Sequence, residues 1–512
     1  MSDKKLQPAV VLVADRTLSA DYKIIFEGIF ATMQTTQVPA AAMRHFVSPK
    51  VKVDADSRAR VVPLGLRRVE AALLKYTDLT ADDIVCTTPE ALGSVLGPWV
   101  KVVGVSSSDP LGQGMSNTTT TSFWEGELYT RLWTRQLLEG IYRAKQKWGF
   151  KVVGGGAGAW QWDRYDDDVA DKCIDVVFEG YFENAGPKLF EQLIGGDLTE
   201  SYICQDKTAD DKVCPIIGAS LLGIIELSRG CGRGCKFCTM SRKKMGHLPV
   251  DTIISDLQTN VAAGVRSVVS GSEDFFRYGS NTTKPDFDKL CSLLHEMQKI
   301  KELSFMQIDH GNITSVMQLS EDELIEIRSL LNWSRRSDYL WVNMGVESAN
   351  GNLVEANCPG KVAPCRPDDW EDVVRQTVDK MTRAGFFSVV SLVLGLPGET
   401  PDDVARTYKL VKYLEQKDAV IFPVFYEPYS VHEIKEVLRF SVEKMRADHL
   451  KLYSSCYEVN FRKVPLLFWD NQRAGGVSWF KRAAMRMLGK TEVRAWRKKF
   501  NSIGKEIARR DA

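Results

Sequence analysis

The sequence has no long apolar run. At the N-terminus, two lysines precede a short apolar segment that ends at Asp15 and Arg16, and such a segment is too short for the core of a signal peptide. No other stretch approaches the roughly 18 apolar residues of a membrane span. These absences argue against export and against a spanning helix, so we expect a cytoplasmic protein.

An excess of charge of one sign is also missing. The 512 residues carry 67 Lys and Arg against 66 Asp and Glu, a formal charge of +1. The hydrophobic content of 44% and the charged content of 26% are those of an ordinary globular protein. This balance predicts no nucleic-acid partner. The length favours two large domains, or two with a small appendage.

Paired cysteines are scarce. Eight of the 11 cysteines stand alone in the sequence, which is not the pattern of a secreted disulfide framework. These eight are Cys86, Cys173, Cys204, Cys214, Cys291, Cys358, Cys365 and Cys456. The other three, Cys231, Cys235 and Cys238, lie within eight residues of one another.

Residues 1–200 alternate between apolar β-rich runs and helical patterns, which predicts a doubly wound (Rossmann-like) α/β domain. The expected strands are Ala9–Ala14, Asp83–Cys86, Lys101–Ser106, Lys151–Gly154 and Asp175–Phe178. Small residues follow three of them, where open α/β sheets bind ligands. These glycines are equally well explained as tight turns. No convincing G-x-G-x-x-G pattern is present, so a dinucleotide is not favoured.

A polar stretch, Asp197–Lys212, is predicted to be a linker. Residues 213–430 then repeat strand and helix, which predicts a partial (β/α)6 TIM-type barrel with its chemistry at the C-terminal ends of the strands. The expected strands are Gly223–Leu227, Ser267–Ser270, Ser304–Ile308, Leu340–Met344, Ser388–Leu394 and Val420–Val424. Residues 431–512 are predicted to be helical, with many cations between Lys481 and Arg510.

The cysteine cluster occurs in Ser228–Cys238, where glycines separate thiols directly after an apolar strand. Three thiolates on a four-iron cube leave one iron open. The C-x3-C-x2-C spacing, with an aromatic residue before the third cysteine, resembles the signature of the radical S-adenosylmethionine (SAM) superfamily. The resemblance implies a 4Fe-4S cluster whose open iron binds SAM and cleaves it to a 5′-deoxyadenosyl radical. The alternative is a zinc site, which requires a fourth ligand such as Cys214 or His247.

Later elements resemble the SAM-binding elements of that superfamily. One follows the second barrel strand, although it departs from the common G-G-E form, and another resembles the G-x-E-S element after the fourth strand. A third, Gly395–Thr400, resembles the G-L-P-G-E-T turn. The residues that the resemblance assigns to SAM are Ser270, Gly271, Ser272, Glu273, Gly345, Glu347 and Ser348.

An α/β domain before such a barrel resembles the cobalamin-binding subfamily of radical SAM enzymes. The implied cobalamin-binding residues are Ser106, Ser107, Ser108, Asp109, Leu111, Gly112, Gly154, Gly155, Gly156, Ala157, Glu179 and Gly180. The D-x-H-x-x-G motif is absent, and His45 is the only histidine in the domain. Cobalamin is therefore expected base-off, without a histidine ligand. Isolated Cys86 and Cys173 disfavour a methylthiotransferase, which places a second cluster in this domain.

The resemblance implies a C-methyltransferase that moves a methyl group from SAM through methylcobalamin to an unactivated carbon, for example Cα of glutamine in a protein or peptide. The alternatives are a lipid (isoprenoid or hopanoid) methylase, non-methylating radical chemistry such as cyclisation or rearrangement, and a metal-binding scaffold without catalysis. Polar residues at predicted strand ends are candidates for placing or deprotonating the substrate: Asp309, His310, Tyr426 and Glu427.

The expected partners are a protein, peptide or lipid substrate and an electron donor such as ferredoxin or flavodoxin. The basic C-terminal helix is suited to contact with a membrane surface. A helix rich in one kind of charge is, however, more often simply exposed to solvent on its charged face.

Overall fold

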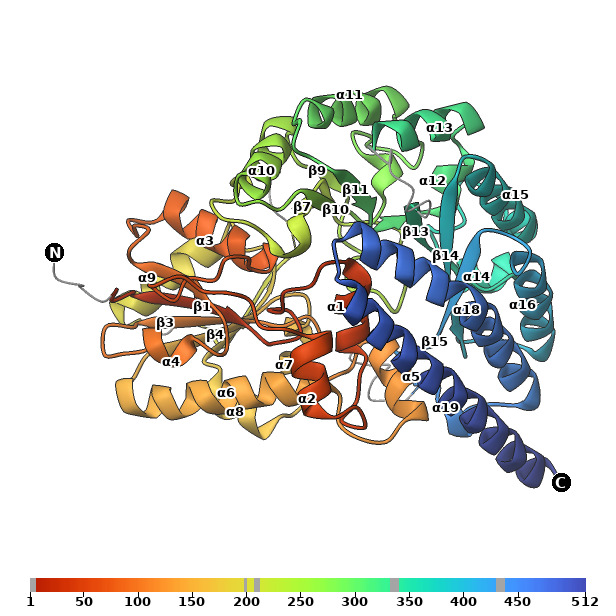
Figure 1. Cartoon of the computed structure of the whole chain (residues 1–512), viewed down its shortest axis with the longest axis horizontal. Coiled ribbons are helices and arrows are strands. Elements are labelled where there is room, and N and C mark those ends of the chain that lie inside the picture. The colour runs from red at the N-terminus through yellow and green to blue at the C-terminus, as the bar shows by residue number, and fades with distance from the viewer. Residues whose placement is uncertain (1–5, 198–199, 207–211, 332–339, 430–437) are drawn as a thin grey trace. The chain divides into compact units, whose positions relative to one another are not determined.

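The computed structural model describes residues 6–197, 200–206, 212–331, 340–429 and 438–512 (Figure 1). The chain divides into two compact units. The first contains Met1–Ile225 and Leu248–Arg266, and the second contains Glu226–His247 and Ser267–Ala512. The chain therefore leaves the first unit, passes through the cysteine motif, and returns to the first unit before it builds the second.

The first unit is built on a six-stranded sheet in the order β2-β1-β3-β4-β5-β6. All of its strand pairs are parallel. The register pairs Ala14 with Ser106 and Ser106 with Gly155, so the carboxyl ends of neighbouring strands meet at one edge. The strands are β1 (Val10–Ala14), β2 (Ile84–Thr87), β3 (Val102–Ser106), β4 (Lys151–Gly155), β5 (Val176–Gly180) and β6 (Tyr202–Gln205).

Helices cover both faces of this sheet, because the strands are apolar on both sides. Helices α3 (Leu64–Tyr76) and α9 (Gly186–Gly195) pack on one face. Helices α4 (Leu92–Val95), α6 (Tyr129–Trp148) and α8 (Asp168–Cys173) pack on the other (Figure 1). The doubly wound prediction is confirmed. The remaining helical segments are α1 (Ile25–Thr32), α2 (Ala40–Ala42), η1 (Met43–Val47), α5 (Met115–Phe123), α7 (Ala159–Arg164) and α10 (Val250–Ala262).

Strand β6 lies inside the stretch that the sequence predicts as a linker, so that prediction is wrong for Tyr202–Gln205. The strand pairs only with β5, at the edge of the sheet. An edge strand has a neighbouring strand on one side only, so four residues with modest apolar character are enough to form it. The polar residues before and after these four hide the apolar strand pattern in the sequence. Residues 198–199 and 207–211 of the predicted linker lie outside the described residues.

The second unit contains the strands of the predicted barrel. Three form a sheet in the order β11-β10-β7, and four form a sheet in the order β12-β13-β14-β15. The break between the sheets follows β11, where Asn343 N–H still donates to Asp309 O at 3.2 Å. The strands are β7 (Ile224–Glu226), which crosses the unit boundary, β8 (Ser228–Arg229), β9 (Gly246–His247), β10 (Ser267–Gly271), β11 (Phe305–Ile308), β12 (His310–Gly311), β13 (Leu340–Glu347), β14 (Phe386–Leu394) and β15 (Ala419–Phe425).

Helices alternate with these strands, and this confirms the predicted α/β fold class. They are α11 (Phe287–Gln298), α12 (Ile313–Met317), α13 (Glu321–Leu330), α14 (Gly351–Asn357), α15 (Trp370–Arg383) and α16 (Pro401–Leu414). Two long helices, α18 (Ala447–Ala474) and α19 (Trp479–Asp511), end the chain side by side (Figure 1). Among the helices of the described residues, none is long and apolar enough to cross a membrane.

A buried ion pair ties α10 to α3 within the first unit. Arg68 donates to both carboxylate oxygens of Asp256, and their side chains are 4% and 0% exposed. Asp256 Oδ1 also accepts the N–H of Ile216 at 2.9 Å. This pair explains why residues 248–266, which follow the cysteine motif, belong to the first unit.

Replacing Arg68 by Met should lower the free energy of unfolding by about 3–5 kcal/mol, because the Asp256 carboxylate would stay buried without its cation. Urea denaturation followed by circular dichroism measures the loss. Lys23→Met removes one partner of the exposed Lys23–Asp21 pair in the same unit and should cost at most about 1 kcal/mol. Equal losses in the two variants would contradict the assigned role of the buried pair.

Candidate functional site

The three clustered cysteines lie on one tight loop. Strands β8 and β9 pair antiparallel and close this loop. Cys231 N–H donates to Lys243 O at 2.9 Å. Gly230, Gly232 and Gly234 have φ of +77°, +73° and +73°, which an L side chain rarely adopts. A Cβ on Gly230 would lie 2.5 Å from Lys244 O. The glycines therefore allow the chain to wind around a compact group.

The three thiols differ in their surroundings. Burial raises the pKa of Cys231, and raises that of Cys238 to about 11. A hydrogen bond from the Cys358 thiol lowers the pKa of Cys235 to about 7, against the effect of burial and with help from the Lys361 charge. Cys358 is fully buried. The sequence shows Cys358 as isolated, yet the fold brings it to the cluster loop.

The donor set fits an iron–sulfur cluster better than a single zinc ion. Within the described residues, no three His, Cys, Asp or Glu side chains gather around the position of one ion. Cys214 donates to Lys212 O at 3.5 Å, and His247 Nε2 lies 2.8 Å from Ser280 O. Each proposed fourth zinc ligand thus has another partner. Three thiols on a glycine-rich loop can ligate three irons of a four-iron cube and leave the fourth iron open.

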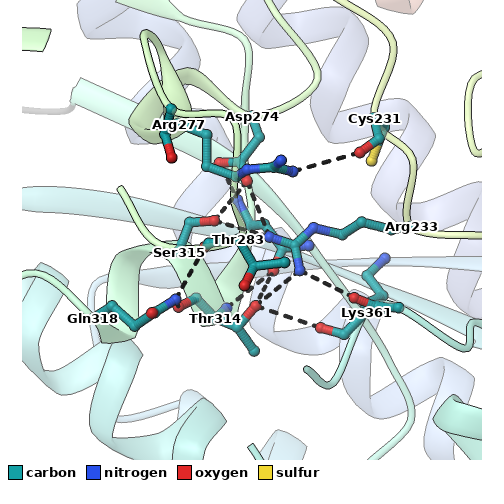
Figure 2. Close-up of polar contacts among 12 residues, drawn as sticks. Cys231, Arg233, Asp274, Arg277, Thr283, Thr314, Ser315, Gln318 and Lys361 are labelled. Atoms are coloured by element: carbon teal, nitrogen blue, oxygen red, sulfur yellow. Dashed lines mark hydrogen bonds and ion pairs between the residues drawn. The ribbon is translucent and has the colours of Figure 1, made fainter. Parts of the chain in front are cut away.

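Arg233, inside the cysteine motif, holds the loop on the second unit (Figure 2). Its Nη1 donates to Thr314 Oγ1 at 3.0 Å and to Gly360 O at 3.1 Å. Its Nη2 donates to Ser315 Oγ at 3.0 Å and lies 3.3 Å from Asp274 Oδ2. Arg233 and Asp274 side chains are 3% and 0% exposed. A buried, charged hydrogen-bond network therefore fixes the middle of the loop.

Backbone contacts add to this network. Gly360 N–H donates to Arg233 O at 2.8 Å, and Lys236 N–H donates to Asn357 O at 3.0 Å. Arg277 Nη1 donates to Cys231 O at 3.4 Å (Figure 2). The segment after α14 thus lies against the cysteine loop, which explains how Cys358 reaches Cys235.

The predicted SAM residues after β10 include two buried oxygens without a partner. Ser270 Oγ and Glu273 Oε2 have no hydrogen-bond partner among the described residues. Burial raises the pKa of Glu273 to about 7. Ser272 Oγ, in contrast, hydrogen-bonds Ser228 Oγ, and Gly271 O accepts Leu227 N–H at 3.0 Å. Buried acceptors are costly unless they are paired, so Ser270 and Glu273 fit a ligand with N–H donors such as the amino group of SAM.

The predicted residues at the end of β13 are engaged within the protein. Glu347 has φ of +65°, at a bulge of the β13–β14 register, and forms a buried ion pair with Lys361. A Cβ on Gly345 would lie 2.3 Å from Lys361 Nζ, so a side chain here would displace the end of the Lys361 side chain. Ser348 Oγ lies 3.2 Å from Thr407 Oγ1. A strained residue such as Glu347 is typical of functional sites.

In the first unit, Asp15 lies where the strand order reverses between β1 and β3. Such switch points are the ligand sites of open α/β sheets. Ser107 Oγ donates to Asp15 Oδ2 at 3.0 Å, and Thr17 N–H donates to Oδ1 at 2.8 Å. Burial raises the pKa of Asp15 to about 6. Asp15 is not among the predicted site residues, although its place directly after an apolar strand is the same signal that identifies Ser106 and Ser107.

Asp109 organises the loop after β3. Its carboxylate accepts hydrogen bonds from Gly114 N–H at 3.1 Å, Asn117 Nδ2 at 2.5 Å and Gln161 Nε2 at 2.6 Å. Burial raises its pKa. Gln161 Oε1 accepts Leu111 N–H at 2.9 Å. Asp109 is therefore occupied in shaping the loop, and Gln161 links that loop to α7.

The predicted glycines serve close packing between loops. A Cβ on Gly156 would lie 2.6 Å from Ser107 O, and one on Gly158 would lie 2.4 Å from Pro110 Cδ. A Cβ on Gly180 would lie 2.1 Å from Gln205 O. Gly156 and Ala157 are nevertheless exposed. The same glycines thus make tight turns and lie at the edge where a ligand is predicted to bind.

All predicted cobalamin residues follow or end neighbouring strands at this one edge of the first unit. The structure places Ser106, Ser107, Ser108, Asp109, Leu111 and Gly112 after β3, Gly154, Gly155, Gly156 and Ala157 at β4, and Glu179 and Gly180 at the end of β5. Glu179 accepts the Tyr202 hydroxyl at 2.8 Å. Asn117 Oδ1, in the following helix, is buried without a partner among the described residues. Small residues and an unpaired amide oxygen fit a large planar ring that carries amide groups. His45 is exposed on η1.

The four candidate catalytic residues differ in their availability. Asp309 Oδ2 lies 3.1 Å from Nδ1 of the exposed His310. Burial disfavours the charged form of His310, but Asp309 outweighs this effect and raises its pKa. Tyr426 is buried edge-on against Phe237 of the cysteine motif, with ring centroids 6.3 Å apart. Glu427 is paired with Arg439. Of the four, the His310–Asp309 pair is the most accessible.

Residues 225–411 match the family model described as the Radical SAM superfamily. This part of the chain is therefore a radical SAM domain, and that prediction is confirmed. The fold of most of the chain is similar to that of the radical SAM methyltransferase TsrM from Kitasatospora setae. One TsrM structure, with tryptophan substrate and a SAM analogue bound, gives a TM-score of 0.53 at 13% identity and covers 81% of this chain and 73% of TsrM. Another, with cobalamin and a [4Fe-4S] cluster, gives a TM-score of 0.52, also at 13% identity, and covers 82% and 72%.

Curated relatives include methylthiotransferases. The ribosomal protein uS12 methylthiotransferase RimO of Trichlorobacter lovleyi is 20% identical over 65% of this chain and 72% of its own length. RimO of Citrifermentans bemidjiense is 24% identical over 49% of this chain and 54% of its own length. The human threonylcarbamoyladenosine tRNA methylthiotransferase is 24% identical over 48% and 40%. The chain thus spans about half the length, or less, of the last two.

Replacing Arg233 by Ala should weaken retention of the reconstituted cluster about 10- to 100-fold, as loss of a residue that orients metal ligands typically does. The Asp274 carboxylate would also stay buried without its cation. Iron and sulfide content during a chelator titration measures the effect. Arg242→Ala changes an exposed arginine of the same loop and should leave retention unchanged. Equal retention in the Arg233 variant would contradict the role of the network.

Replacing Asp15 by Asn should change the pH dependence of stability. The pKa of Asp15 is raised from 3.8 to about 6 by burial, so the native state binds more protons and loses stability as pH rises through this window. Asn stays neutral in both states. The free energy of unfolding of the variant minus that of the wild type should therefore grow by about 2 kcal/mol between pH 4 and 6, and by about 3 kcal/mol in all between pH 3 and 7, where it levels off. Urea titrations across this range test it, and a flat difference would contradict it.

Proposed function

We propose that this protein is a cobalamin-dependent radical SAM C-methyltransferase that moves a methyl group from SAM to an unactivated carbon. The observation that carries the proposal is the extent of the fold likeness to TsrM, which covers 81% of the chain. This is more than the second unit contains, so the likeness includes the α/β sheet of the first unit as well as the radical SAM domain.

Residues of both units are suited to hold the three groups. Cys231, Cys235 and Cys238 would ligate the 4Fe-4S cluster, and Ser270 and Glu273 would accept the amino group of SAM. The carboxyl edge of the first sheet would receive cobalamin base-off, without a histidine ligand. When bound, these groups supply one-electron chemistry and carry the methyl group.

The protein's own residues would hold these groups and position the substrate. Arg233 and Asp274 fix the cysteine loop, and Asp15, Ser107 and Asp109 shape the edge of the first sheet. Because Asp309 raises the pKa of the exposed His310, this imidazole would hold a proton beside the substrate. Tyr426 packs on the cysteine motif and Glu427 binds Arg439, so both would support the site through their neighbours.

We do not extend the methylthiotransferase activity of these relatives to this chain. Cys86 and Cys173 are buried on opposite faces of the sheet, in separate apolar clusters. They are therefore unable to ligate one second cluster in the first unit. The likeness to these relatives is consistent with a shared radical SAM domain, and we propose simple methyl transfer.

For the recipient we propose a protein or peptide carbon, for example Cα of glutamine. Two of the relatives are named for a ribosomal protein substrate, which favours this class over an isoprenoid or hopanoid lipid. An electron donor such as ferredoxin or flavodoxin, acting in the cytoplasm, would supply the electrons.

Incubating the anaerobically reconstituted protein with SAM, cobalamin, a reductant and cell extract should yield both S-adenosylhomocysteine and 5′-deoxyadenosine. The product should be heavier by one CH2 group. Cys238→Ala should form no 5′-deoxyadenosine, because the cluster loses a ligand. Deoxyadenosine without homocysteine formation would contradict methyl transfer and favour non-methylating radical chemistry. Methyl-labelled SAM, followed by separation of protein from lipid, identifies the recipient class.

A further inference from the structure

The last helix, α19, packs along only part of its length. It lies beside α18 (Figure 1), and aromatic side chains hold its C-terminal half against that helix. The ring centroid of Tyr457 in α18 lies 4.4 Å from that of Trp496 and 5.5 Å from that of Phe500. Ile503 and Ile507 are buried on the same side. This half is an ordinary amphipathic helix with its apolar face covered.

The N-terminal half of α19 exposes its apolar residues instead. Phe480, Met487 and Trp479 are 80%, 67% and 59% exposed and are the three most exposed large apolar side chains of the described residues. Leu488 is 44% exposed. Such a concentration of exposed apolar side chains marks an interaction surface.

These side chains form a stripe. Phe480, Ala484, Met487 and Leu488 have the spacing i, i+4, i+7 and i+8, which places them on one face of a helix. Trp479 lies at the start of the helix, one position before Phe480. Met485, on the opposite side, is buried. The exposed stripe therefore faces away from the side that packs on the unit.

Cations border the stripe on both sides. At 100° per residue, Lys481 lies on one side of it and Lys490 on the other, while Arg482 and Arg486 lie toward the opposite side of the helix. Arg482 and Arg486 also lie over the Trp469 ring of α18, at 4.6 and 5.4 Å from its centroid. Residues 479–490 contain no Asp or Glu. The net charge of the protein is only +1, so this local excess of cations is a distinct feature.

From this arrangement we propose that residues 479–490 of α19 dock the protein on the surface of a membrane that contains anionic phospholipids. The apolar stripe would enter the boundary between headgroups and acyl chains, and the flanking cations would lie along it with their charges at the phosphates. Anionic headgroups complement the two lysines that flank the stripe, Lys481 and Lys490. A nucleic acid would instead require cations at the centre of the face, where the apolar residues lie.

Sedimentation with vesicles tests the proposal on the full chain. The wild type should bind vesicles of phosphatidylcholine with phosphatidylglycerol at least about tenfold more tightly than vesicles of phosphatidylcholine alone, and the difference should shrink in high salt. Phe480→Ser combined with Met487→Ser should weaken binding at least about tenfold, since it removes the buried apolar area. Lys481→Glu combined with Lys490→Glu should abolish the preference for anionic vesicles.

Ile325→Ser is the matched control. Ile325 is an exposed apolar residue of α13, 46% exposed, and this variant should bind vesicles like the wild type. Failure of the wild type to bind anionic vesicles, or wild-type binding by the Phe480 and Met487 variant, would overturn the proposal. So would a wild-type dimer in analytical centrifugation that the same variant dissociates, because the stripe would then be a protein interface. None of these results bears on methyl transfer, which is measured separately.

Discussion

The buried pair of Arg233 and Asp274 is the interaction on which the candidate site depends. The loop that carries the three cysteines has glycines at alternate positions and few apolar side chains of its own, so few local contacts besides the backbone bonds that close it fix its shape. The Arg233 guanidinium reaches out of this loop to two hydroxyls, a carbonyl and a carboxylate, all within 3.3 Å. A charge buried this deeply is tolerated only when it is paired and hydrogen-bonded. The loop therefore keeps one shape only while these partners stay in place.

Both units use parallel strands to gather short side chains at one edge, but they do so with different means. In the first unit, loops pack directly on loops, and glycines at Gly156, Gly158 and Gly180 make the close approach possible. In the second unit, ion pairs and hydroxyls perform this task, as at Glu347 and Lys361. The exposed residues of the first edge include the small residues Gly156 and Ala157, while a buried ion pair lies at the second edge. This difference suits a planar ring at one edge and a charged amino acid group at the other.

Much of the architecture could be predicted from the sequence, because buried parallel strands are continuous apolar runs and the cysteine spacing is specific. The parts that could not be predicted depend on partners far away in sequence. Cys358 has no neighbouring cysteine in the sequence, yet α14 ends beside Cys235. The role of Asp109 inside its own loop depends on Gln161, 52 positions later. Strand β6 is hard to recognise in the sequence because an edge strand needs little apolar character. Asp15, in contrast, could be predicted, because it follows an apolar strand just as Ser106 ends one.

The return of the chain to the first unit after the cysteine motif has a consequence for synthesis on the ribosome. Asp256, which neutralises buried Arg68, lies after the cysteines in the chain. The first unit is therefore incomplete until about 266 residues have emerged. By then the cysteine loop has been made, while the strands β10–β15 of its own unit have not. Domains generally fold as units during synthesis, so the first unit is complete in sequence before Thr314, Ser315 and Gly360, which hold Arg233, have been added.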